Sequence, residues 1–154
     1  MTQALTVTPG TRVDLADFDP RYVAGDEDKE SAKEKVKENA QRLAELGYRL
    51  YAENRRSLLL VLQGIDTAGK DGTIRHVMRG FNPQSCRVTS FKQPSEEELD
   101  HDFLWRIHKA APRRGNIGIF NRSHYEDVLV VRVHQLVDDV EWRSRYEIIN
   151  SYER

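Results

Sequence analysis

A short segment bounded by glycines carries the residues best suited to phosphate chemistry. Gly64, Gly69 and Lys70 fit the pattern G-x-x-x-x-G-K, the body of a P-loop. Glycines let the backbone curl so that several N–H groups point at phosphate oxygens, and the helix that follows adds the positive end of its dipole. The Lys70 ammonium reaches the phosphoryl group being transferred. The pattern therefore predicts phosphate binding; the alternative is an ordinary glycine-rich turn between a strand and a helix.

Acidic residues in this segment depart from the usual pattern. Asp71 stands where the motif normally has the Ser or Thr that binds Mg²⁺, and Thr73 follows two residues later. Asp66 lies inside the loop, where a carboxylate about 4 Å from a phosphate is repelled by roughly 4 kcal/mol at an effective dielectric constant near 20. A cation between the two groups removes that conflict. We expect Asp66 to bind Mg²⁺ or to activate the acceptor; the alternative is a solvated loop aspartate.

A second group of polar residues follows the apolar run at residues 117–120. Ligands of parallel sheets collect beyond the carboxyl ends of the strands, so Asn121 and Arg122 should lie beside the P-loop. The Asn121 amide can ligate Mg²⁺, and Glu126 can hold the metal or its waters. Arg122 offers a planar fork that stabilises charge on phosphate oxygens. For Glu126, capping of the next helix together with Ser123 is an almost equally good interpretation.

The elements that must position these residues alternate between strands and helices, which predicts an α/β fold with a parallel sheet. Continuous apolarity over residues 57–63 predicts a strand covered on both faces. Ser31 and Glu34 have the spacing of a helix-capping box. We expect, in chain order, an irregular arm over 1–30, helix 31–54, strand 57–63, helix 70–79, strand 87–91, one helix from 94–98 to Pro112, strand 117–120, a helix from 124 and a helix from 139 to the end.

The composition excludes several classes of protein. The 154 residues suffice for one domain with its own core, and a net charge of −1 argues against a general nucleic-acid or membrane-surface binder. No stretch approaches the roughly 18 apolar residues of a membrane-spanning helix, and no secretory signal is evident. Cys86 is the only cysteine, which excludes an internal disulfide and a multi-cysteine metal site. We therefore expect a cytoplasmic protein that binds neither nucleic acid nor membranes.

The two polar motifs together resemble those of the polyphosphate kinase 2 family. The segments that carry the resemblance are Gly64-Ile-Asp-Thr-Ala-Gly-Lys-Asp-Gly-Thr-Ile74 and Phe120-Asn-Arg-Ser-His-Tyr-Glu-Asp-Val-Leu129, and it extends over roughly residues 9–154. The chain is most similar to the branch that phosphorylates AMP and ADP with inorganic polyphosphate. The resemblance implies a P-loop kinase fold with a three-layer α/β/α arrangement, Mg²⁺ dependence, assembly into homo-oligomers, and reversible phosphoryl transfer between polyphosphate and AMP, ADP or ATP.

The resemblance, which covers Asp66, Lys70, Asn121 and Arg122, and the chemistry of the neighbouring side chains together give roles for individual residues. Asp66, Lys70 and Arg122 are the expected catalytic residues, and Asp66, Asn121 and Glu126 are the expected Mg²⁺ ligands. Some relatives carry Asp where this chain has Asn121. For Arg75, a solvated helix face is the alternative to lining a path for polyphosphate. The residues expected to bind phosphate or nucleotide are Gly64, Thr67, Ala68, Gly69, Lys70, Asp71, Gly72, Thr73, Arg75, Lys92 and Arg106.

The length of the chain departs from the family pattern. Family members continue past a helix ending near Arg154 into another core strand, an arginine-bearing lid and closing helices. We therefore expect residues 31–154 to be the N-terminal part of a P-loop kinase domain, with about three strands, from a fragment, a truncated product or a split protein. Two other functions stay open: a different P-loop kinase that uses ATP as donor, and an inactive phosphate-binding or assembly module, since transfer needs closure to exclude water.

Overall fold

The structure, a computed structural model, describes residues 7–19, 21–22 and 28–154. The chain divides into two units, Met1–Asn39 and Ala40–Arg154. The first unit contains a short 3-10 helix, η1 (Leu15–Asp17), and the first turns of a long helix that begins at Lys29. Residues 1–6, 20 and 23–27 of the expected irregular arm over 1–30 lie outside the described residues, so the arm as a whole stays a prediction. The second unit contains all the candidate site residues.

Helix α1 (Lys29–Glu53) begins earlier than expected. The Asp28 carboxylate accepts hydrogen bonds from the N–H groups of Glu30 and Ser31, at 3.0 and 2.8 Å. An aspartate in this position satisfies N–H groups that have no partner within the helix. The Ser31–Glu34 cap was therefore the wrong choice of helix start, because Asp28 caps the same turn from three residues upstream.

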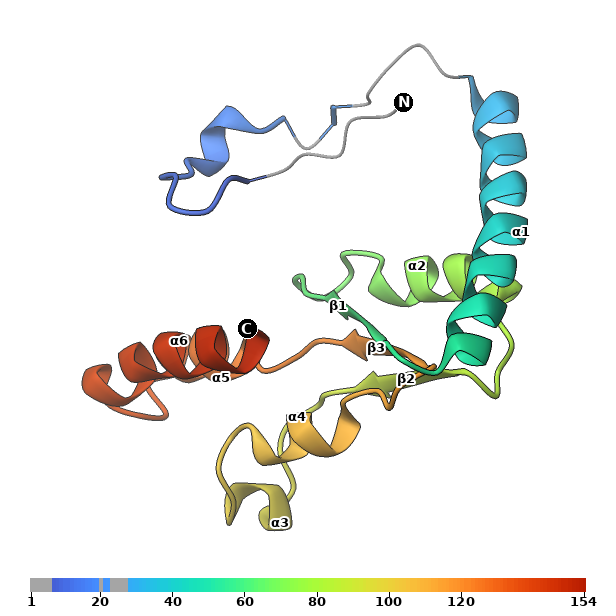
Figure 1. The fold of residues 1–154 in the computed structure, drawn as a ribbon. Coiled ribbons are helices and arrows are strands. Elements are labelled where there is room, and N and C mark those ends of the chain that lie inside the picture. The colour runs from blue at the N-terminus through green and yellow to red at the C-terminus, as the bar shows by residue number, and fades with distance from the viewer. Residues whose placement is uncertain (1–6, 20, 23–27) are drawn as a thin grey trace. The chain divides into compact units, whose positions relative to one another are not determined.

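The sheet confirms the predicted fold class. Its three parallel strands are β1 (Leu58–Leu62), β2 (Cys86–Ser90) and β3 (Ile117–Asn121), and the order β1-β3-β2 places β3 in the middle (Figure 1). Each strand begins and ends within one residue of its predicted range. The register pairs Leu62 of β1 with Asn121 of β3, so the ends of these two strands lie side by side.

One face of the sheet packs into a core, and the other is only partly covered. Phe120 is fully buried, and its ring meets that of Phe91 edge-to-face at 4.8 Å between centroids. Ile107 of helix α4 (Trp105–Ala110) completes this core. On the opposite face, Leu58 and Leu60 are 52% and 40% exposed. Coverage of β1 on both faces is therefore wrong for the described part of the chain, because the face that carries Leu58 and Leu60 is left largely open to solvent.

The single helix expected between residues 94 and 112 is two helices. Helix α3 (Glu96–Leu99) begins with a capping box, in which Ser95 and Glu98 exchange hydrogen bonds. The Asp102 carboxylate then accepts the N–H of Leu104 at 2.9 Å, and its backbone carbonyl accepts the N–H of Trp105. Side chains of this kind compete with helical hydrogen bonds. Asp102 thus starts a second helix, α4, and interrupts the first.

The remaining helices follow the predicted order. Helix α2 (Lys70–Val77) continues as the 3-10 helix η2 (Met78–Gly80), and α5 (Glu126–Val133) begins two residues after the expected start at 124. Helix α6 (Asp139–Glu153) lies beside α5 (Figure 1). Among the described residues, no helix is long and apolar enough to cross a membrane.

Candidate functional site

The loop between β1 and α2 closes around the Lys70 side chain. The Lys70 ammonium donates hydrogen bonds to the backbone carbonyl oxygens of Gly64 and Ile65, each at 2.8 Å. Gly69 sits at the N-terminus of α2 with φ +83°, a left-handed conformation that glycine adopts without strain. The N–H groups of the first turn of α2 have no partner within the helix, so they face the loop as donors. This is the geometry that the P-loop pattern predicts.

The ends of β1 and β3 bring two opposite charges together. Asp66 follows β1, Arg122 follows β3, and the Asp66 carboxylate forms an ion pair with the Arg122 guanidinium. The Asp66 side chain is 81% exposed and that of Arg122 36%. Arg122 has φ +62°, so the chain turns sharply as it leaves the strand. The sequence-based expectation that Asp66 and Arg122 lie close together is met in the structure.

A second contact joins the start of α2 to the end of β3. The Asn121 amide nitrogen donates to the Asp71 carboxylate at 2.7 Å. Asp71 therefore places a carboxylate beside Asn121, in the position where the usual motif has a hydroxyl. Asp66, Asp71 and Asn121 form a set of hard oxygen donors, of the kind that Mg²⁺ prefers.

These residues line a cavity of about 520 Å³. Its wall is made by residues 66–72, 90–93, 121 and 122. Three cationic side chains, from Lys70, Lys92 and Arg122, share this wall with the carboxylates of Asp66 and Asp71. A lining that offers both cations and carboxylates suits a phosphate group bound together with a metal ion.

The oxygen donors of the cavity fit a Mg²⁺ ion that takes its remaining oxygens from a bound phosphate and from water. Nowhere in the described ranges do three His, Cys, Asp or Glu side chains meet as a cluster able to hold a metal. Mg²⁺ commonly uses only one or two carboxylates and takes its other oxygens from water and phosphates. Asp66 and Asp71 supply two carboxylates at the cavity, and the Asn121 amide lies next to Asp71.

The cavity wall also contains residues that the sequence reasoning missed. Ser90, Phe91 and Gln93 come from the end of β2 and the residues after it. The rule that ligands collect beyond the carboxyl ends of parallel strands had been applied to β1 and β3. Applied to the strand predicted over 87–91 as well, it would have indicated this third wall.

Some expected phosphate-binding residues support the loop and do not line the cavity. The Gly64 carbonyl accepts from Lys70, and the Thr73 hydroxyl donates to the Gly69 carbonyl at 3.2 Å. Arg75 lies exposed on α2, outside the cavity lining, which favours the solvated-face interpretation. Gly64, Thr73 and Arg75 lie outside the cavity lining, and their direct contact with phosphate stays a prediction.

Glu126 takes neither of its two expected roles. Its carboxylate accepts a hydrogen bond from the Gln63 amide at 2.6 Å, and it is not part of the cavity lining. The capping box with Ser123 does not form either, because the Ser123 hydroxyl bonds the Gln63 side chain and accepts the N–H of Tyr125. Gln63, at the end of β1, competes for both side chains. This corrects the assignment of Glu126 as a metal ligand.

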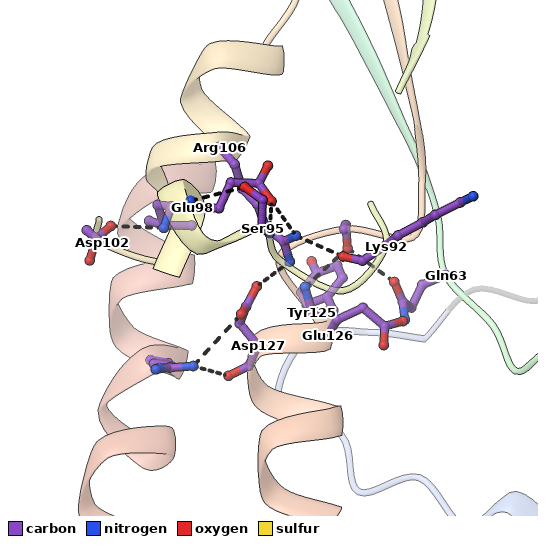
Figure 2. A network of polar contacts seen from close by, with 12 residues as sticks. Gln63, Lys92, Ser95, Glu98, Asp102, Arg106, Tyr125, Glu126 and Asp127 are labelled. Carbon is purple, nitrogen blue, oxygen red and sulfur yellow. Dashed lines mark hydrogen bonds and ion pairs between the residues drawn. The ribbon is translucent and has the colours of Figure 1, made fainter. Parts of the chain in front are cut away.

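Arg106 is a second correction. Its side chain is only 8% exposed and lies in an internal network, shown in Figure 2, instead of on the cavity wall. One guanidinium nitrogen donates to the Lys92 carbonyl at 2.9 Å, and the other lies 3.5 Å from the Asp127 carboxylate. Glu98 lies 3.6 Å away. The acceptors Lys92, Glu98 and Asp127 occupy the donors that a phosphate would need.

The network continues from Asp127 to the last helix. Arg145 of α6 donates to the Asp127 backbone carbonyl at 2.9 Å, and its guanidinium lies 4.0 Å from the carboxylate. Burial raises the pKa of the Asp127 carboxyl above its usual value, against the opposing effects of Arg106 and Arg145. Asp127 and Arg145 gave no signal in the sequence that would have marked them as partners of Arg106.

A second cluster joins the start of α5 to the end of α6. His124 is 1% exposed, and its Nε2 lies 3.1 Å from the Glu153 carboxylate. The Tyr125 hydroxyl donates to the same carboxylate. Burial, with Glu153 adding to the effect, raises the pKa of Tyr125 to about 12. Tyr125 therefore stays protonated over the working range of most enzymes.

Comparison with known families identifies one match. Residues 26–154 match the family model described as polyphosphate kinase 2 (PPK2). The match therefore includes both polar motifs and every residue of the cavity wall.

Curated proteins with known names show the same similarity. The chain is 44% identical over 165 residues to an ADP-polyphosphate phosphotransferase of Rhodopseudomonas palustris, covering 99% of this chain and 57% of that protein. It is 49% identical over 149 residues to an AMP/ADP-polyphosphate phosphotransferase of Meiothermus ruber, covering 96% of this chain and 56% of that protein. The chain thus spans about half the length of the curated relatives it matches.

Solved structures show the same similarity to polyphosphate kinase 2. The chain superposes on the crystal structure of a polyphosphate kinase 2 from Arthrobacter aurescens TC1 with a TM-score of 0.89 and 43% sequence identity. The superposition covers 96% of this chain and 53% of that one. The arrangement of strands and helices described above is therefore shared with an experimentally determined fold.

Proposed function

The chain belongs to the polyphosphate kinase 2 family, and from that premise we propose that it takes part in phosphoryl transfer between inorganic polyphosphate and AMP, ADP or ATP. The names of the Rhodopseudomonas and Meiothermus relatives describe transfer between polyphosphate and ADP or AMP by those proteins. One observation carries the proposal furthest: Lys70, Arg122 and Asp66, which follow two neighbouring strands, face the same cavity.

The chemistry proposed for this cavity is an in-line displacement. A phosphate oxygen of the nucleotide attacks the terminal phosphorus of polyphosphate, and the bond from that phosphorus to the next bridging oxygen breaks. Lys70 and the loop N–H groups bind phosphate oxygens, and Arg122 stabilises the charge that spreads over the transferred group. Asp66 and Asn121 would hold Mg²⁺, which when bound neutralises phosphate charge. Positioning and charge stabilisation supply most of the catalysis in reactions of this class.

Further parts of the proposal concern organisation and location. We propose residues 31–154 as a P-loop kinase domain preceded by an arm over 1–30, and association of the chain with copies of itself. A cytoplasmic location is supported by the single cysteine, Cys86, since disulfide-rich chains mark oxidising compartments. Size-exclusion chromatography with light scattering tests self-association directly.

Product analysis by anion-exchange chromatography tests the function. The chain is incubated with Mg²⁺, polyphosphate and either AMP or ADP, and in parallel with ATP and small-molecule acceptors. We expect ADP or ATP to form at the expense of polyphosphate, and no formation with Lys70→Met. Turnover with ATP and another acceptor but not with polyphosphate would favour a different P-loop kinase, and binding of polyphosphate without transfer would favour a binding module.

A further inference from the structure

We propose that Arg106 is a positioning residue for residues 91–93 of the cavity wall, which we call the Lys92 segment. Arg106 binds the backbone of this segment on the side away from the cavity, and the ion pair with Asp127 fixes the Arg106 side chain in place. The inference rests on the proposed function, because it deepens the description of the same phosphate cavity. It replaces the expectation that Arg106 binds phosphate itself.

The contacts of Arg106 reach two residues of the cavity wall. Its guanidinium donates to the Lys92 carbonyl at 2.9 Å and lies 5.5 Å from the centre of the Phe91 ring. Both Lys92 and Phe91 line the cavity. Figure 2 shows the Lys92 side chain extending away from Arg106. Arg106 thus holds the backbone of Lys92 while leaving its ammonium group free to face a ligand.

The Lys92 segment depends on this contact. The Phe91 N–H donates to the Asn121 carbonyl at 3.0 Å, which is the last bond between this segment and the sheet. Within the part of the chain that the structure describes, the bond from Arg106 is then the only hydrogen bond made by the backbone of residues 92–94. Without it, the Lys92 ammonium would sit on a backbone without a fixed position.

The charge of Arg106 is buried and therefore needs its partners. Its side chain is 8% exposed, and that of Asp127 is 12% exposed. A buried charge that loses its partner is strongly destabilising, so Arg106 and Asp127 hold each other in place. Arg145 in turn binds the Asp127 backbone carbonyl, which ties α6 to the same network.

Arginine is suited to this role because its guanidinium is a planar fork. Arg106 reaches the Lys92 carbonyl with one nitrogen and the Asp127 carboxylate with the other. A lysine keeps the charge but has a single ammonium group, which cannot span both acceptors in the same geometry. Arg106→Lys is therefore the substitution that separates positioning from charge.

Calorimetric titration of the whole chain with tripolyphosphate in Mg²⁺ buffer tests the inference. We expect Arg106→Lys to bind tripolyphosphate roughly threefold to tenfold more weakly than the wild type. Lys92→Met removes the ammonium group but keeps the carbonyl. If Arg106 acts by positioning Lys92, adding Arg106→Lys to Lys92→Met causes little further loss, so the double-mutant cycle shows coupling.

Arg145→Lys is the matched control. Arg145 is similarly buried, at 12% exposure, and shares Asp127, but makes no bond to Lys92. Thermal unfolding should show that both arginine variants are destabilised, while Arg145→Lys keeps its affinity for tripolyphosphate within about twofold of the wild type. If Arg106→Lys does not fold, Asp127→Asn is measured instead, and the same direction of change is expected.

The outcomes separate the two proposals. Wild-type binding with an unaffected Arg106→Lys overturns the positioning role alone. An equal loss in Arg145→Lys, or a loss from Arg106→Lys that persists in full beside Lys92→Met, also overturns it, because the effect is then general loosening. A wild-type chain that does not bind tripolyphosphate overturns the proposed function and the positioning role with it.

Discussion

Asp66 and Arg122, 56 residues apart in the sequence, neutralise each other in the wall of the cavity. Lys70 is likewise engaged, by two carbonyl oxygens of its own loop. Lys70 and Arg122 are thus both bound to acceptors within the protein. Binding of phosphate by these two side chains must exchange these acceptors for phosphate oxygens.

Substitution of Asp66 should therefore have opposite effects on binding and on transfer. Asp66→Asn frees Arg122 and removes a negative charge from the cavity, and exposed ion pairs contribute up to about 1 kcal/mol. We expect tripolyphosphate to bind up to about fivefold more tightly in Mg²⁺-free buffer, while phosphoryl transfer is lost. Calorimetry with and without Mg²⁺ measures the first effect and product analysis the second. Full transfer activity in Asp66→Asn would contradict its assignment.

Removal of the Lys70 ammonium should abolish function with little effect on folding. Lys70→Met keeps the length of the side chain but cannot bind phosphate, and loss of one such electrostatic contact typically lowers turnover about 100-fold or more. The two hydrogen bonds it loses go to exposed or half-buried loop carbonyls that water can reach. Circular dichroism should show a melting temperature close to that of the wild type. A variant that folds and retains turnover would contradict the site.

Two glycines of the loop and helix offer a matched pair. A Cβ atom at Gly69 or Gly72 meets nothing within 4 Å, so neither substitution is limited by space. Gly69 has φ +83°, and Gly69→Ala should lower the free energy of unfolding by roughly 1–2 kcal/mol. Gly72 lies within α2, and Gly72→Ala should raise it by about 0.4–1 kcal/mol. Urea unfolding of both variants measures the difference, and equal effects would refute the left-handed turn.

The Asp127 carboxyl should make stability fall as pH rises. Its pKa is raised in the folded chain above the ordinary value of 3.8, so the folded state binds more protons than the unfolded state between those two pKa values. By linkage, this group's contribution to stability is greatest below 3.8 and is lost as pH rises through the folded pKa. The melting temperature of the wild type should therefore fall relative to that of Asp127→Asn as the pH rises, because only the wild-type carboxyl loses a proton. A difference between them that does not change with pH would contradict the raised pKa.

The sequence was most informative where short-range patterns decide the structure. The apolar run before Gly64 and the lysine after Gly69 locate β1, the loop and α2, because a P-loop is built from consecutive residues. The ends of β1 and β3 could be placed together because parallel strands share an edge for their carboxyl ends. The closeness of Asp66 and Arg122 follows from that rule alone.

Long-range competition for partners was not predictable in the same way. Arg106 donates a hydrogen bond to Lys92, fourteen residues before it, and Gln63 donates one to Glu126, sixty-three residues after it. No local spacing encodes such pairs, because they depend on how helices pack once the sheet has formed. The break at Asp102 was missed for another reason: one side chain outcompeted the helical hydrogen bonds of an otherwise continuous apolar pattern.

The in-register pairing of Leu62 with Asn121 also sets the spacing of the chemistry. One residue of a strand spans about 3.3 Å, slightly more than the length of a hydrogen bond. Deleting a single residue from β1 or β3 would shift Lys70 relative to Arg122 by that amount and turn the remaining side chains to the opposite face. The hydrogen-bonded pairing of β1 with β3 therefore sets the separation between Lys70 and Arg122, and a shift of one residue is enough to disrupt it.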